Sequence, residues 1–195
     1  MNYLAHFHLA WPDEDLVAGG LEGDYLKGPL DMQKSSGLQR GVQLHRMIDG
    51  FTDRHRSLTR LRDYFQPSMR RFSGILIDLS FDHFLSSHWS NFSALPLEDF
   101  NREIYRSLKE RRQHLSPGAQ HMLQRLVQYD LLGRYTDWDT VPAAAERIGE
   151  RFRRGNPFIG IEDQMMDLQP ALEDAFLEFY PDLQDFAAAQ VKALN

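Results

Sequence analysis

Apolar residues recur at helical spacing along most of this 195-residue chain, and this feature constrains the fold more than any other. Alternating apolar and polar runs, which are typical of half-buried strands, are scarce. The segment Arg70–Trp89 illustrates the pattern, because its apolar residues are spaced as on a helix (Phe72, Ile75, Leu76, Leu79, Phe84 and Leu85). A protein built on a parallel sheet would show apolar runs alternating with such helices. The pattern therefore predicts an all-α fold.

Proline and glycine fall at the ends of the predicted helices rather than in one long linker. The chain shows no internal repeat and no low-complexity tract, and its length suits one domain with a substantial core. We therefore predict a single helical bundle over residues 1–195. A turn at Ser35-Ser36-Gly37 should precede one central helix, and Pro181 should mark a join between two C-terminal helices. A helix capped by Asp13 or Asp15 should run to about Lys27.

Composition narrows the class of protein. The 42% hydrophobic and 26% charged content is typical of a soluble globular protein. The chain has no cysteine, which excludes disulfides, a thiolate nucleophile and a cysteine-based zinc site and fits a reducing compartment. The opening residues lack the pattern of a signal peptide, and no apolar run reaches membrane-spanning length. We therefore expect a cytoplasmic protein without a membrane partner.

Charge is distributed unevenly along the chain. The net charge of -6 argues against general nucleic-acid binding, yet residues 40–71 carry eight arginines against three aspartates. Residues 162–185 carry eight acids and no lysine or arginine. A local basic surface on an acidic protein suits an acidic partner or a phosphorylated substrate. Solvated helix faces are the alternative interpretation.

The stretch LHRMIDGFTDRHRSL, residues 44–58, concentrates histidine and aspartate. Residues four apart share a helical face, so His45 and Asp49 can present an imidazole and a carboxylate side by side. Gly50 is expected to end this helix, with Thr52 or Asp53 capping the next. That corner would bring Asp53 and His55 close to the first pair, which would suit a metal site.

Two further segments carry candidate ligands. Asp78 and Asp82 are four apart and His83 is adjacent, in a segment whose apolar residues predict a core helix; acids there are costly unless paired or bound to metal. Asp24 lies in an earlier segment. Without cysteine, an imidazole and carboxylate set favours an ion such as manganese, magnesium or zinc, which can activate water and neutralise a phosphate ester. Caps and salt bridges are the alternative for each residue.

Other signals are weaker. His6 and His8 cannot share a helical face, and His6 is equally compatible with a core and a functional position. The glycines have neither P-loop nor dinucleotide-binding spacing, and no serine lies in a nucleophile-elbow context.

Four blocks of the sequence resemble the acyl carrier protein phosphodiesterase family: MNYLAHFHLA, GLEGDYLKG, GVQLHRMIDGFTDRHRS and DLSFDHFLSSHW. They follow in the family's order, and the length matches a family member from end to end. The resemblance is densest over roughly the first ninety residues.

The resemblance implies an all-α fold similar to a distorted HD-type phosphohydrolase. It implies a manganese-dependent phosphodiesterase of lipid metabolism (fatty acid biosynthesis), with magnesium or another divalent ion as a substitute. The enzyme would remove the 4'-phosphopantetheine arm from a serine of holo-acyl carrier protein, giving apo-protein and free phosphopantetheine. The partner would be this acidic carrier protein.

Carried over to matching positions, the resemblance implies metal ligation by Asp24, His45, Asp82 and His83. Asp49 and Asp53 would orient ligand histidines, and Asp78 would lie with them in the catalytic set. His55 would be the general acid toward the leaving serine oxygen. The substrate-binding residues would be Lys27 and Arg46, on the phosphate, with Arg54 and Arg56 on a docking surface that also includes Arg60 and Arg62. The pair Asp82-His83 runs in the reverse order of the HD motif.

Two other functions remain open at this stage. The first is an HD-type phosphohydrolase of a small nucleotide such as guanosine tetraphosphate, which would need a base-binding pocket. The second is a non-catalytic helical module that binds an acidic protein, in which the histidines and aspartates serve as caps and salt bridges.

Overall fold

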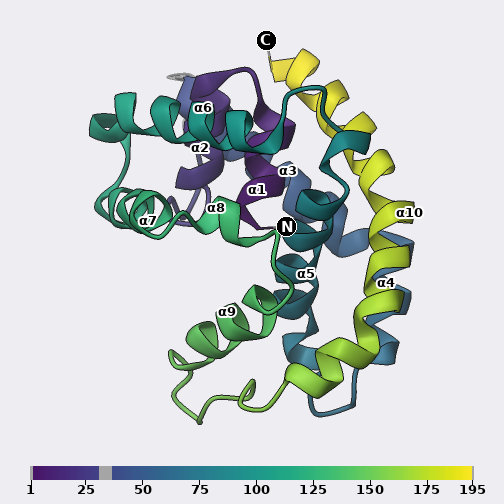
Figure 1. The fold of residues 1–195 in the computed structure, drawn as a ribbon. Helices are drawn as coiled ribbons and strands as arrows, with labels where there is room; N and C mark the ends of the chain where they lie inside the picture. The colour runs from purple at the N-terminus through teal and green to yellow at the C-terminus, as the bar shows by residue number, and fades with distance from the viewer. Residues whose placement is uncertain (1, 31–36, 195) are drawn as a thin grey trace.

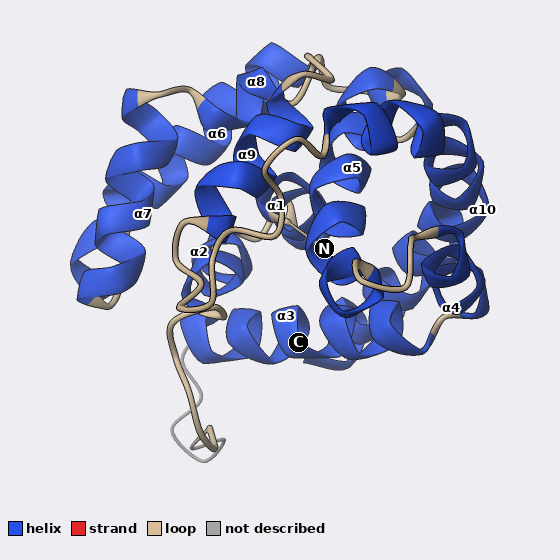
Figure 2. Ribbon diagram, turned by 90° about the horizontal axis from the view of Figure 1, so that it is seen from below, coloured by secondary structure: helices blue, strands red, loops and turns tan. Residues whose placement is uncertain are grey.

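The computed structural model describes residues 2–30 and 37–194, and every regular element in them is helical (Figures 1 and 2). The predicted all-α class is confirmed. The helices are α1 (Tyr3–Ala10), α2 (Glu14–Glu22), α3 (Gly37–Arg54), α4 (Arg56–Leu61), α5 (Ser73–Ser87), α6 (Leu97–Glu110), α7 (Pro117–Gln128), α8 (Leu131–Arg134), α9 (Thr140–Gly149) and α10 (Glu162–Leu194), with 3-10 turns at Arg62–Tyr64, Arg70–Phe72, Trp89–Asn91 and Arg112–His114. No helix of the described residues is long and apolar enough to cross a membrane.

The short helix α1 lies at the centre of the fold and contacts α2, α3, α5 and α10 (Figure 1). Leu4, Ala5 and Phe7 are completely buried, and His6 is only 2% exposed. A helix that is apolar on nearly all sides is stable only when other helices surround it. The α1 segment therefore carries its side chains directly into the core.

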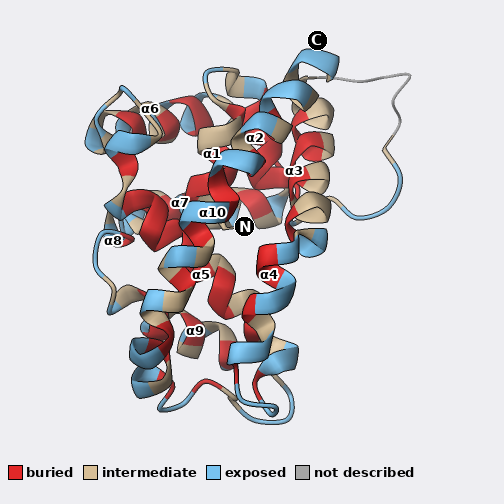
Figure 3. Ribbon diagram, turned by 90° about the vertical axis from the view of Figure 1, so that its right-hand side faces the viewer, coloured by how far each residue is buried: buried red, intermediate tan, exposed pale blue. Residues whose placement is uncertain are grey.

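Helices α2 and α3 pack closely because each has a glycine at the point where they cross. A Cβ on Gly19 would overlap the Gly41 backbone, and a Cβ on Gly41 would overlap the Gly19 backbone in turn. The buried residues of α3 lie on its side toward α1 and α2 (Figure 3). This close approach brings His45 of α3 against the end of α2.

The prediction that the helix ends at Gly50 is wrong, because α3 continues through Gly50 to Arg54. Glycine in a helix interior costs only about 1 kcal/mol. Packing of the following turn outweighs that cost: Thr52 is buried, and the Phe51 ring stacks on Phe186 of α10 with centroids 4.5 Å apart. The break comes instead at His55, whose side chain caps α4.

Two other predicted boundaries also move. Helix α2, capped by Asp13, ends at Glu22 rather than near Lys27, which leaves Asp24 in the turn that follows. Helix α10 runs unbroken through Pro181, because this region packs on α1, α3, α4 and α5 and buries Phe179, Tyr180 and Leu183. Ser35 and Ser36 of the predicted turn lie outside the described residues.

Candidate active site

A cluster of two histidines and one aspartate lies where α1 meets α3. The Nε2 atom of His6 is 3.2 Å from Asp49 Oδ1, and Nε2 of His45 is 3.1 Å from Asp49 Oδ2. One ligand atom from each of the three residues lies within 4.8 Å of the other two. The pairing of His45 with Asp49 follows the predicted helical spacing. His6 joins them from the other helix.

The orientation of His45 is set by its other nitrogen. Nδ1 lies 2.9 Å from the carbonyl oxygen of Gly20, which can only accept, so Nδ1 carries the proton. In the neutral ring, Nε2 then presents a lone pair toward Asp49, which is the arrangement of a metal-ligating histidine. Gly23 lies so close to the ring that a Cβ at this position would overlap it. The C-terminal end of α2 thus determines the position and orientation of the His45 imidazole.

His6 is held by stacking rather than by hydrogen bonds. Its ring lies 4.0 Å from that of His45 at an interplanar angle of 14°. Its Nδ1 is buried and has no hydrogen-bond partner among the described residues, and its Nε2 faces Asp49 without hydrogen-bond geometry. Burial, together with the neighbouring His45, lowers the pKa of His6 to about 4. His6 is therefore neutral at pH 7 and offers a lone pair.

Asp49 is ionised at neutral pH. Burial alone would raise its pKa, but the neighbouring rings of His45 and His6 hold the pKa well below its usual range. Two imidazole nitrogens and one carboxylate oxygen thus lie within 4.8 Å of one another, close enough to bind a single cation. The donor set of two imidazoles and a carboxylate therefore fits a divalent metal ion.

Asp49 and three further carboxylates line a cavity of about 230 Å³ beside the cluster. Asp24 lies 3.7 Å from His45 Nε2, and Asp53 accepts a hydrogen bond from Arg62 at 3.3 Å. Asp78 of α5 lines the same cavity, and its burial raises its pKa. Asp49 thus connects the cluster to a cavity that is also lined by three further acids and one guanidinium group (Asp24, Asp53, Asp78 and Arg62).

Asp82 and His83 belong neither to the cluster nor to the lining of this cavity. The Asp82 carboxylate accepts the backbone N–H groups of Leu4 at 2.8 Å and Ala5 at 3.1 Å, and so caps the N-terminus of α1. Its burial nevertheless raises its pKa to about 7. His83 Nδ1 donates to the Tyr135 carbonyl oxygen at 2.8 Å. In the described structure His6 and Asp49, rather than this pair, are the partners of His45.

Asp82 is therefore tied to the site through α1, which carries His6. One sequence segment supplies a candidate metal ligand, and another caps the helix that carries it. Sequence reasoning did not place His6 in the candidate ligand set, although it lies in the first block of the family resemblance, because its partners are about forty residues away.

The remaining predicted residues lie at the edge of the site or outside it. His55 Nε2 is 3.3 Å from Asp182 of α10, and His55 is not among the described residues that line the carboxylate cavity. Arg46 donates to the Leu26 carbonyl oxygen at 2.7 Å and so fixes the turn after α2. Arg56 pairs with Glu178, while Lys27 and Arg54 are exposed.

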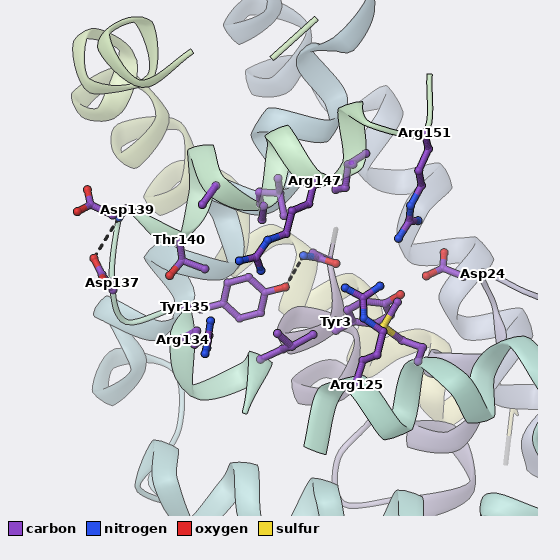
Figure 4. Close-up of a pocket in the computed structure, with 17 residues that line it drawn as sticks. Tyr3, Asp24, Arg125, Arg134, Tyr135, Asp137, Asp139, Thr140, Arg147 and Arg151 are labelled. Carbon is purple, nitrogen blue, oxygen red and sulfur yellow. Dashed lines mark hydrogen bonds between the residues drawn. The ribbon is translucent and has the colours of Figure 1, made fainter. Parts of the chain in front are cut away.

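A second, larger cavity of about 470 Å³ adjoins the first, since Asp24 lines both. Arginines from α7, α8, α9 and the residues after α9 surround it: Arg125, Arg134, Arg147 and Arg151 (Figure 4). Sequence reasoning did not identify this cavity.

Comparison with known proteins assigns the family. The model of the family described as acyl carrier protein phosphodiesterase matches residues 1–183. The chain is 31% identical to a protein named acyl carrier protein phosphodiesterase from Klebsiella pneumoniae subsp. pneumoniae, over 96% of this chain and 97% of that protein. It is 30% identical to a protein of the same name from Escherichia coli O45:K1, over 96% and 98%. The chain belongs to the acyl carrier protein phosphodiesterase family.

Membership makes this chain a hydrolase of phosphodiester bonds, as predicted, and argues against the non-catalytic module. A protein of the same name from Shigella boydii serotype 18 is 31% identical over the full length of both chains. No solved structure matches the chain, and the likeness to HD phosphohydrolases stays a prediction.

Proposed function

We propose that this phosphodiesterase acts on holo-acyl carrier protein and releases the 4'-phosphopantetheine group from its serine. The relatives that match the chain along nearly its whole length are named for acyl carrier protein. In the proposed reaction the oxygen of water forms a bond to phosphorus while the bond from phosphorus to the serine Oγ breaks. The serine oxygen takes up a proton, and the phosphate leaves with the pantetheine.

The observation that carries this proposal is the cluster of His6, His45 and Asp49. We propose that these residues hold a divalent metal ion, manganese first and magnesium or another ion as substitutes, with Asp24 beside them. When bound, such an ion lowers the pKa of water and neutralises phosphate charge. The lone pairs of the two imidazoles and the ionised Asp49 suit this role.

The other cavity residues would handle the phosphate and the proton. Arg62, anchored by its hydrogen bond to Asp53, would bind phosphate oxygens, because a guanidinium group offers several donors in one plane. Asp78 would donate a proton to the serine Oγ, since burial raises its pKa and so favours the protonated carboxyl. Asp78 lines the cavity, whereas His55 lies against α10, so Asp78 takes the role first predicted for His55.

Mass spectrometry of intact holo-acyl carrier protein would test the proposal. The carrier protein would be incubated with this enzyme plus manganese, and in parallel with enzyme treated with a chelator. We expect loss of the phosphopantetheine mass only with the metal. A carrier protein of unchanged mass, with the enzyme shown to be folded and metal-loaded, would exclude this substrate. Guanosine tetraphosphate would be included as the competing substrate class.

A further inference from the structure

The larger cavity is lined by four arginines whose side chains make no hydrogen bond or ion pair with a described residue: Arg125, Arg134, Arg147 and Arg151. Several arginines elsewhere in the described structure do pair with acids. Arg106 and Arg111, for example, make five ion pairs with acids of α2 and α6 at up to 3.0 Å. These four guanidinium groups outnumber the three carboxylates that line the cavity, those of Asp24, Asp137 and Asp139, so the lining favours an anionic ligand.

Figure 4 shows the guanidinium groups of Arg147, Arg125 and Arg151 around the space between Tyr135 and Asp24. Tyr135 is buried and accepts a hydrogen bond from the Asn2 side-chain amide. Asp137 also lines the cavity, but its carboxylate accepts from the Asp139 backbone N–H at 3.1 Å on the other side of Tyr135. Arg125 and Arg151 therefore lie at the end of the cavity nearer to Asp24, Arg147 lies beside Tyr135, and Arg134 lies on the side of Asp137.

The remaining lining is largely apolar. Leu79 of α5, Met122 of α7, Leu131 of α8 and Ile148 of α9 contribute side chains, and Ala143 and Ala144 leave room between them. At about 470 Å³ the cavity falls within the range of small-molecule sites, roughly 300–1,000 Å³. An extended ligand with methyl groups, amides and one anionic end would match this combination of apolar and donor groups.

The position of the cavity next to the cluster limits which ligand it can bind. Asp24 lines both cavities, so a group bound beside it would lie next to the His6, His45 and Asp49 cluster. A phosphodiester split at that cluster has two sides, and one of them must extend into the adjoining space. The side that fits a cavity of this size is a single flexible chain rather than a folded protein.

We infer that the arginine-lined cavity binds the phosphopantetheine arm, with its phosphate between Asp24 and the guanidinium groups of Arg125 and Arg151. The gem-dimethyl group and methylene carbons of the arm lie on the apolar lining. Arg147 and the Tyr135 hydroxyl face its amide and hydroxyl groups. This inference rests on the proposed function, because it assigns one half of the proposed substrate to a place in the enzyme.

Binding of free 4'-phosphopantetheine would test the inference without any turnover. Calorimetry would compare the intact enzyme with the variants Arg125→Gln and Arg147→Gln. Each variant loses a charged hydrogen-bond donor, so we expect at least about tenfold weaker binding for each. Arg102→Gln on α6, which removes an exposed arginine paired with Asp99, is the matched control and should bind as the parent protein does.

Ala144→Phe supplies a second variant that leaves every charge in place. It fills the apolar part of the cavity and should weaken binding of free phosphopantetheine at least tenfold, while circular dichroism confirms that the protein is folded. The same variants would be tested against apo-acyl carrier protein, which lacks the arm. We expect their affinity for apo-protein to remain within about twofold of the parent.

The outcomes separate the possibilities. If the parent protein does not bind free phosphopantetheine, or if the variants bind it normally, the inference is wrong. If the arginine variants instead lose affinity for apo-acyl carrier protein, the cavity is a docking site for the protein surface, and the inference is wrong as well. If the parent binds phosphopantetheine through these arginines but leaves holo-carrier protein intact, the proposed function fails and the assignment of the cavity stands.

Discussion

The two adjoining cavities of this enzyme are built in opposite ways. Beside the smaller one, whose lining includes Asp49, His45 is oriented by the Gly20 carbonyl and the Gly23 backbone, and the helix that carries His6 is capped by Asp82. In the larger one the arginines of α7, α8 and α9 point into open space without a described partner. The difference suggests that one region is organised before any ligand binds, whereas the other gains its charge partners from the ligand.

Removing a member of the cluster should give the largest effect. Residues that only orient a metal ligand typically change metal affinity or activity by about 10- to 100-fold, so His45→Gln or His6→Gln should cost more than about a hundredfold in kcat/KM. The bound metal, measured by elemental analysis after dialysis against manganese, should fall in parallel. Full metal content and full activity in His6→Gln would show that α1 contributes no ligand.

The second-largest effect is expected for Gly23, which lies against the His45 ring. In Gly23→Ala the new methyl group overlaps the His45 ring, so the ring must move and manganese affinity should fall about 10- to 100-fold. Gly74→Ala is the control, because a Cβ at Gly74 meets nothing within 4 Å although it also lies beside the smaller cavity. Equal manganese affinity in the two variants would mean that the backbone of α2 does not set the position of this ligand.

Asp82 tests whether a buried carboxylate near the site acts on the fold or on the metal. Asp82→Asn weakens a buried charged acceptor of two backbone N–H groups, and the free energy of unfolding should fall by about 1–3 kcal/mol. Manganese bound per folded molecule should stay the same, because the carboxylate oxygens contact α1. Chemical denaturation and elemental analysis would measure the two quantities. Lost metal with unchanged stability would restore Asp82 to the ligand set expected from the sequence.

The same contrast explains what could be predicted from the sequence. The all-α class and the pairing of His45 with Asp49 depend on spacing within one helix, which sequence periodicity reports directly. The contact of His6 with Asp49 depends on how two helices pack. Spacing does not report that, and the expected break at Gly50 was overridden by the packing of Phe51 against α10. Asp24 was a candidate from the residues, and the resemblance implied its role as a ligand, but its position between the two cavities depends on the fold.

The arginine cavity was beyond sequence reasoning for a different reason. Arg125, Arg134 and Arg147 come from three separate helices, and each one alone resembles a solvated position on an amphipathic helix. Only their convergence on one space distinguishes them. The basic segment that did attract attention, residues 40–71, is partly neutralised in the fold, because Arg56 pairs with Glu178 and Arg62 with Asp53.

The smallest effect is therefore expected for Arg56→Gln. The pair of Arg56 and Glu178 is exposed, with side-chain exposures of 74% and 51%, and exposed pairs contribute about 0–1 kcal/mol. Stability should change by less than about 0.5 kcal/mol. The KM for holo-acyl carrier protein should remain near that of the parent at low and high salt, in contrast to Arg147→Gln. A raised KM that depends on salt for Arg56→Gln would place carrier docking at α4, as the charge pattern of the sequence first indicated, and would leave the arginine cavity to the arm alone.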